Sequence, residues 1–202
     1  MKELLNKIKN LFTKNEIVNP TAVLAVICIV VTLALSSTNL LTKDRIAKLA
    51  VKAQNEAMAK LIEADEYTEL PAQTSFGEVS YHAAIKDGDT IGILLVTEAN
   101  GYGGTIKVMT AVDMNCSIVA IEILDASGET PGLGQNVTKE SFYSQFKGES
   151  GQIDAVTGAT ISSTGVTNAV NQALKYANEI ISNQEVATET IENVSNDKEV
   201  LE

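Results

Sequence analysis

The chain has 202 residues, of which 45% are hydrophobic and 20% are charged, so its composition is that of an ordinary globular protein. The formal net charge of −11 argues against nucleic acid and anionic membrane surfaces as partners, because both need a basic face. The cysteines, Cys28 and Cys116, and the single histidine, His82, exclude an intramolecular disulfide and the usual zinc sites, since Cys28 lies in an apolar run.

The N-terminal part of the chain contains a long uncharged stretch. No charged residue occurs from Ile17 to Thr42, and the apolar centre runs from Ala22 to Leu35. A transmembrane helix needs about 20 predominantly apolar residues, so a single span is predicted over residues 17–42. A cleavable signal peptide is the alternative. The uncharged run is longer than a typical signal-peptide core, and a helix-forming segment follows it directly.

Charges on the two sides of this stretch predict its orientation. Four lysines and two acids precede it: Lys2, Lys7, Lys9, Lys14, Glu3 and Glu16. The positive-inside rule then predicts a cytoplasmic N-terminus over residues 1–16, with everything after Lys43 extracytoplasmic. Residues 43–202 hold 24 acidic and 11 basic side chains, a net of −13, whereas residues 1–42 are net +2. The acidity therefore belongs to the exported part.

A helix followed by a series of strands is predicted next. Apolar residues recur every three or four positions from Lys43 to Glu63, as in an amphipathic helix. Pro71 and Gly77 then indicate a loop. Alternating apolar residues predict four strands, over residues 79–85, 91–96, 106–112 and 118–124. Asp87-Gly88 is typical of a tight hairpin turn, and Asn115 is expected to take the left-handed conformation in a second turn.

Loops and helices dominate the rest of the chain. The sequence predicts a loop from Asp125 to Asn136, a short helix capped by Thr138, and one more strand over Ile153–Val156. A small-residue turn over residues 157–164 precedes a helix predicted from Gly165 to Ile181. The acidic, aperiodic residues 183–202 predict a disordered tail. Together these elements predict an α+β domain over residues 43–182, with an antiparallel sheet flanked by helices.

One segment has a composition that suits an anion. Thr157-Gly158-Ala159-Thr160 is expected to join a strand end to a helix start, where unpaired N–H groups favour a phosphate. Gly158 and Ala159 allow close approach, and the hydroxyls of Thr157, Thr160 and Ser162 can cap the helix or donate to a phosphate. An ordinary capped helix fits these residues as well, so both interpretations stay open at this point.

Three motifs carry a resemblance to a known family. Thr157-Gly158-Ala159-Thr160, followed by Ile161-Ser162-Ser163, resembles the flavinylation motif of the FMN-binding domain family. Gly101-Tyr102-Gly103-Gly104 and Glu129-Thr130-Pro131-Gly132-Leu133-Gly134 are similar, in order and spacing, to one branch of it, the G-subunit of the Rnf electron-transport complex. The resemblance covers roughly residues 20–182. Ser127-Gly128 depart from the family's bulkier or charged pattern, and the chain has no tryptophan.

The resemblance implies a covalent FMN. In that family the second threonine of the motif, here Thr160, is esterified to the FMN phosphate by a separate flavin transferase that uses FAD and Mg²⁺. Thr157, Gly158, Ala159 and Ser162 would then surround the phosphate. Residues of the other two motifs would lie against the isoalloxazine ring, namely Tyr102, Gly103, Gly104, Glu129, Thr130, Leu133 and Gly134.

By the same resemblance the chain is an electron-transfer subunit without a complete activity of its own. It would relay electrons through FMN to other subunits of the ion-translocating ferredoxin:NAD⁺ oxidoreductase (Rnf) complex, as a single-pass protein of the cell (inner) membrane. The sequence shows no dinucleotide fingerprint, iron–sulfur cysteine set or catalytic triad. The C-subunit of the Na⁺-translocating NADH:quinone oxidoreductase is one alternative. A non-redox FMN- or phosphate-binding module is another.

Overall fold

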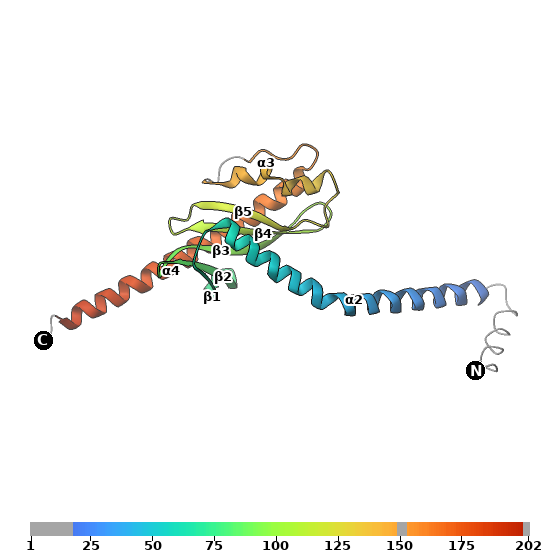
Figure 1. Cartoon of the computed structure of the whole chain (residues 1–202), viewed down its shortest axis with the longest axis horizontal. Helices are drawn as coiled ribbons and strands as arrows, with labels where there is room; N and C mark the ends of the chain where they lie inside the picture. Colours follow the sequence, from blue (N-terminus) through green and yellow to red (C-terminus); the bar gives the residue numbers. More distant parts are fainter. Residues whose placement is uncertain (1–17, 149–152, 200–202) are drawn as a thin grey trace. The chain divides into compact units, whose positions relative to one another are not determined.

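A computed structural model of the chain describes residues 18–148 and 153–199 and divides the chain into two compact units after Val51. The first unit contains most of α2 (Val18–Leu61), and the second contains the end of α2 and all later elements. These are, in chain order, β1 (Glu66–Thr74), β2 (Gly77–Lys86), β3 (Asp89–Asn100), β4 (Thr105–Asp113), β5 (Ile118–Asp125), the 3₁₀ turn η1 (Gly134–Thr138), α3 (Glu140–Tyr143), the 3₁₀ turn η2 (Ser144–Phe146) and α4 (Thr160–Glu199) (Figure 1).

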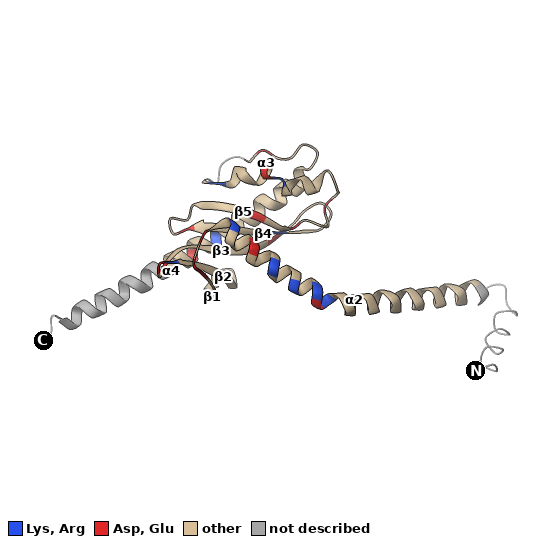
Figure 2. Ribbon diagram, viewed as in Figure 1, with Lys and Arg blue, Asp and Glu red and all other residues tan. Residues whose placement is uncertain are grey.

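The first part of α2 has the length and composition of a membrane span. Among the described residues, the helix from Pro20 onward is the one long and apolar enough to cross a membrane, with a mean hydropathy of 2.3 over an 18-residue window. Figure 2 shows this part of α2 without charged side chains, followed by a stretch rich in Lys and Arg. The hydroxyls of Ser37, Thr38 and Thr42 donate to carbonyls four residues earlier, which satisfies them without water. The predicted membrane helix is therefore supported, and the helix predicted after it is also part of α2.

The five strands form one antiparallel sheet in the order β1-β2-β3-β4-β5. Each strand pairs with the next one along the chain, so the sheet is built from consecutive hairpins. Asp87 and Gly88, with φ of 54° and 92°, turn the chain between β2 and β3, as predicted. In the turn between β4 and β5, the residue in the left-handed region is Cys116, with φ of 60°. The prediction that Asn115 takes this conformation was therefore wrong.

The prediction of a loop around Pro71 was also wrong. Pro71 lies within β1 and is paired with Ser80 of β2. Because β1 is an edge strand, a residue without an N–H can be accommodated there. The burial pattern of β1 is mostly exposed, so its sequence lacks the apolar alternation that identified the other four strands.

Both faces of the sheet are covered. On one face, apolar side chains of β2 to β5 pack against α4, which contributes Val166, Ala169, Val170, Ala173 and Ala177 (Figure 1). On the other face, Leu94, Met109 and Ala111 pack against Met58 and Leu61 at the end of α2. Burying such side chains supplies most of the stabilisation of a domain of this size.

Three expectations for the second half of the chain differ from the structure. Residues Ile153–Val156 form no strand. The helix predicted with a Thr138 cap is instead η1, α3 and η2, and α3 is preceded by Lys139 with no side-chain cap. α4 begins at Thr160, five residues before the predicted start. The backbone of α4 continues to Glu199, and the disordered tail expected over residues 183–202 stays a prediction; residues 200–202 lie outside the described part.

Two buried threonines on the sheet face under α4 allow a test of this packing. The Thr97 hydroxyl donates to the Ala169 carbonyl at 2.8 Å, whereas the buried Thr110 hydroxyl has no hydrogen-bond partner among the described residues. We expect Thr110→Val to stabilise the domain by about 1 kcal/mol, since it removes an unsatisfied polar group, and Thr97→Val to destabilise it by about 1 kcal/mol. Urea unfolding of the detergent-solubilised chain, followed by circular dichroism, measures both. If Thr110→Val and Thr97→Val lowered the free energy of unfolding by the same amount, that result would contradict this packing.

Candidate functional site

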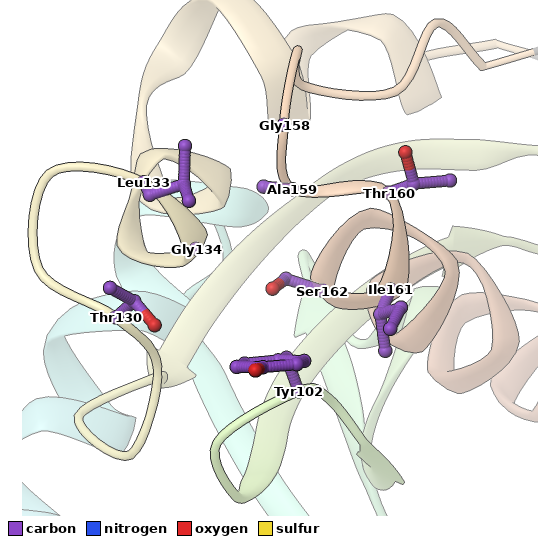
Figure 3. Close-up of a pocket in the computed structure, with 9 residues that line it drawn as sticks. All are labelled: Tyr102, Thr130, Leu133, Gly134, Gly158, Ala159, Thr160, Ile161 and Ser162. Atoms are coloured by element: carbon purple, nitrogen blue, oxygen red, sulfur yellow. The ribbon is translucent and has the colours of Figure 1, made fainter.

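A cavity of about 610 Å³ lies at one end of the sheet, where three loop segments meet the start of α4. Its lining residues come from the loop after β3, the loop after β5 with the start of η1, the turn before α4 and the first turn of α4. They are Tyr102, Thr130, Leu133, Gly134, Gly158, Ala159, Thr160, Ile161 and Ser162 (Figure 3). Protein cavities that bind small ligands typically measure about 300–1,000 Å³. The cavity is therefore large enough for a cofactor.

The wall formed by α4 presents polar groups of the helix start. The Ser163 N–H bonds to the Ala159 carbonyl. The N–H groups of Thr160, Ile161 and Ser162 therefore precede the first bonded donor, and they have no partner among the described residues. Gly158, with φ of 76°, forms the turn just before the helix. Unpaired N–H groups and the positive end of the helix dipole favour an anion here.

The three hydroxyls of this helix start have different surroundings. Ser163 is buried, and its hydroxyl accepts from the Val156 N–H and donates to the Ala159 carbonyl, both at 3.0 Å. Ser162 is also buried and donates to a carboxylate oxygen of Glu129. Thr160 is exposed, and its hydroxyl has no partner among the described residues. Of the three hydroxyls at this helix start, the one free to react at the cavity wall is therefore that of Thr160.

Glu129 joins the three segments from behind the cavity wall. It is only 2% exposed, and its Oε1 accepts the Gly103 N–H at 3.0 Å while its Oε2 accepts the Ser162 hydroxyl. Asp125 precedes this loop and accepts the Ser127 N–H at 2.8 Å, a bond that lowers the pKa of the Asp125 carboxyl. The carboxylate of Glu129 therefore connects the loop after β3, its own loop and α4.

Glycines surround this carboxylate because no side chain would fit. A Cβ at Gly101 would overlap Glu129 Oε1, and one at Gly134 would lie 2.7 Å from Oε2. A Cβ at Gly103 would overlap the Gly128 carbonyl oxygen. Gly128 thus lies where the two loops touch.

Most of the predicted site residues meet at this cavity. Eight of them line it: Tyr102, Thr130, Leu133, Gly134, Gly158, Ala159, Thr160 and Ser162. Thr157, Gly103, Gly104 and Glu129 are not among its lining residues, and Glu129 is directed to the Gly103 N–H and Ser162 instead. Ile161, which the sequence analysis missed, lines the cavity and is 55% exposed. The available signal in the sequence was its position between Thr160 and Ser162, inside the quoted motif.

The His, Cys, Asp and Glu side chains of the described residues were the candidates for a metal site. Among the described residues, no group of three or more His, Cys, Asp or Glu side chains could hold a metal ion. His82 is half-buried in β2, where burial lowers its pKa, and its Nε2 lies 3.4 Å from Gln54 Nε2. Cys116 occupies the β4–β5 turn.

Comparisons with known proteins agree with the position of this site. Residues 101–175 match the FMN-binding domain family, and residues 6–61 match the RnfG N-terminal region. The G-subunit of the proton-translocating ferredoxin:NAD(+) oxidoreductase complex of Clostridium ljungdahlii is 31% identical over 176 residues, which cover 80% of this chain and 92% of that protein. The G-subunit of the ion-translocating oxidoreductase complex of Methanosarcina acetivorans is 27% identical over 186 residues, covering 80% of this chain and 94% of that protein.

A solved structure is also similar. It is the C-subunit of the Na(+)-translocating NADH-quinone reductase from Parabacteroides distasonis, with a TM-score of 0.46 and 23% sequence identity. The similarity covers 53% of this chain and 64% of that chain.

Two neighbouring glycines test the contact between the loops. A Cβ at Gly103 would clash with the Gly128 carbonyl oxygen, whereas a Cβ at Gly104 would lie 3.5 Å from Gly128 Cα, an ordinary contact. We expect Gly103→Ala to lower the free energy of unfolding by about 1–3 kcal/mol, because a backbone must move to relieve the overlap. Gly104→Ala should change it by less than about 1 kcal/mol. Urea unfolding of the two variants measures the difference, and equal values would show that the loops do not touch as described.

Proposed function

Because the chain belongs to the family of G-subunits of the ion-translocating ferredoxin:NAD⁺ oxidoreductases, we propose that it is the membrane-anchored flavoprotein of such a complex, with FMN esterified to Thr160. Two similarities favour this assignment over the C-subunit of the Na⁺-translocating NADH:quinone oxidoreductase. The chain covers 92% of the Clostridium ljungdahlii G-subunit, and its residues 6–61 match the RnfG N-terminal region. The other subunits of the complex are its proposed partners.

The observation that carries the covalent attachment is the unengaged hydroxyl of Thr160. Ser162 and Ser163, its neighbours on the same turn, are buried and hydrogen-bonded within the protein, whereas Thr160 faces the cavity and solvent. Attachment by a flavin transferase joins Thr160 Oγ to the phosphorus of the FMN moiety of FAD. It breaks the pyrophosphate bond, releases AMP and removes the hydroxyl proton.

The residues present fit FMN in both of its parts. The N–H groups of Thr160, Ile161 and Ser162 provide donors for the phosphate, where the helix dipole stabilises its charge. Tyr102, Leu133 and Ile161 provide the apolar surface that a planar ring system needs, and Thr130 adds a polar group. Gly158 leaves room next to Leu133, since a Cβ there would lie 3.0 Å from the Leu133 side chain.

This arrangement suits an electron carrier. A bound FMN supplies one- and two-electron transfer, and the protein holds it and controls its surroundings. Tyr102 is 69% exposed, Leu133 42% and Ile161 55%, so the cavity opens at the protein surface. Electrons can therefore reach a flavin at this position from another subunit, without passage through the core of the domain.

The proposed location of the flavin domain is outside the cytoplasm, as the positive-inside rule predicts from the lysines that precede the span. Charge counting supports it weakly, because basic residues flank both sides of the span: four precede it, and Lys43, Arg45, Lys48 and Lys52 follow within ten residues.

Removal of the Thr160 hydroxyl tests the covalent bond. We expect the wild-type chain, co-expressed with a flavin transferase, to give a fluorescent band on a denaturing gel, and Thr160→Val to abolish it. Thr164→Val is the matched control, since Thr164 is exposed one turn later on α4 and should leave the band unchanged. A dark wild-type band would contradict the covalent attachment and favour reversible FMN or phosphate binding. A fluorescent Thr160→Val band would place the bond on another residue.

Cysteine labelling tests the orientation. In a chain with Cys28→Ala and Cys116→Ala, the change Glu140→Cys introduces one thiol at an exposed position of α3. We expect a membrane-impermeant maleimide to label it in cells whose cytoplasmic membrane is intact. The same chain without Glu140→Cys should stay unlabelled. Labelling that requires permeabilisation of that membrane would place the domain in the cytoplasm.

A further inference from the structure

We propose that the buried charge of Glu129 lowers the reduction potential of the flavin, although Glu129 does not line the cavity. This inference rests on the proposed function, because it assumes FMN in the cavity at the start of α4. It assigns Glu129 a role different from that expected of its motif, which was contact with the ring.

The carboxylate lies directly behind the cavity wall. Its Oε2 accepts the hydroxyl of Ser162, which lines the cavity, and a Cβ at Gly134, another lining residue, would lie only 2.7 Å from the same oxygen. Its Oε1 accepts the N–H of Gly103, and Tyr102, the residue before Gly103, also lines the cavity. Ser162 therefore separates one carboxylate oxygen from the cavity, and Gly103 binds the other next to the lining residue Tyr102.

Two hydrogen bonds stabilise the carboxylate of Glu129, and no basic side chain of the described residues forms an ion pair with it. The ion pairs in the described part of the chain are Lys52–Glu56, Lys60–Glu122 and Lys107–Glu98. Glu129 is 2% exposed, so water screens it little, and its interactions with nearby charges are stronger than those of a surface carboxylate. The first turn of α4, to which Ser162 belongs, provides only partial positive charge.

Reduction of a flavin adds negative charge to its ring system. A fixed negative charge behind the wall opposes that addition and stabilises the oxidised form, so it lowers the reduction potential. A residue that served only to hold the loops together would act through its hydrogen bonds, and its charge would not matter. The two roles therefore differ in what an uncharged replacement of the same shape does.

Glu129→Gln is that replacement. Its amide oxygen can accept the Gly103 N–H, and its NH₂ group can donate to Ser162 Oγ if the hydroxyl reverses direction. The variant therefore removes one charge and keeps the connections between the three segments. Ser162→Ala makes the complementary change: it keeps the charge and removes one of the two donors that partly neutralise it.

Redox titration of the flavin-loaded, detergent-solubilised full chain tests the proposal, with flavin absorbance as the readout. We expect Glu129→Gln to shift the reduction potential to a more positive value and Ser162→Ala to shift it to a more negative one. Glu78→Gln is the matched control, because it removes the same charge from an exposed position of β2 and should leave the potential at the wild-type value.

The outcomes separate this inference from the proposed function. Flavin-loaded Glu129→Gln with the wild-type potential would overturn the role of the charge and leave the flavin site intact. Shifts of Glu129→Gln and Ser162→Ala in the same direction would assign Glu129 a purely structural role. If Glu129→Gln fails to retain flavin, Ser162→Ala decides, and an unchanged or more positive potential overturns the inference. A wild-type chain that contains no flavin at all overturns the proposed function, and this inference with it.

Discussion

The carboxylate of Glu129 accepts hydrogen bonds from the Gly103 N–H and the Ser162 hydroxyl, and these two bonds hold together segments that are 26 and 33 residues distant in the sequence. A buried carboxylate is costly unless donors surround it, so it favours the one loop arrangement that provides both of them. The same requirement explains the glycines at positions 101 and 134, since a Cβ at either would overlap the carboxylate. The shape of the cavity thus depends on a group that lies outside it.

The position of Thr160 depends in turn on how α4 rests on the sheet. A Cβ at Gly165 would lie 2.9 Å from the Asn100 carbonyl oxygen, so the first turns of α4 pack directly on the end of β3. One turn further along, the Thr97 hydroxyl donates to the Ala169 carbonyl at 2.8 Å. Because α4 contacts β3 at both Gly165 and Ala169, the start of the helix has little freedom to move away from the loop after β3. Rigid elements therefore hold the hydroxyl proposed to carry the cofactor.

The apolar pattern of the sequence predicted the strands that contribute many side chains to the core and missed the strand that does not. The strands now called β2 to β5 alternate apolar and polar residues or are apolar throughout, and the turn at Asp87-Gly88 has the conformation its residues favour. β1 is an edge strand with Pro71 in its middle, and most of its side chains are exposed. It is held by pairing with β2, a long-range interaction that leaves no pattern in its own residues.

The motifs identified the segments of the site but not the direction of individual side chains. Loops have no period, so nothing in the sequence separates Glu129, which is buried beneath the cavity wall, from Thr130, which lines the cavity. The sequence predicts a small-residue turn over residues 157–164 and a helix start at Gly165. Because α4 begins at Thr160, successive residues point about 100° apart. Ser162 therefore reaches Glu129, Ser163 turns back to Val156, and Thr160 is left facing the cavity without a partner among the described residues. The helix start, five residues earlier than periodicity suggests, is what distinguishes three chemically similar hydroxyls.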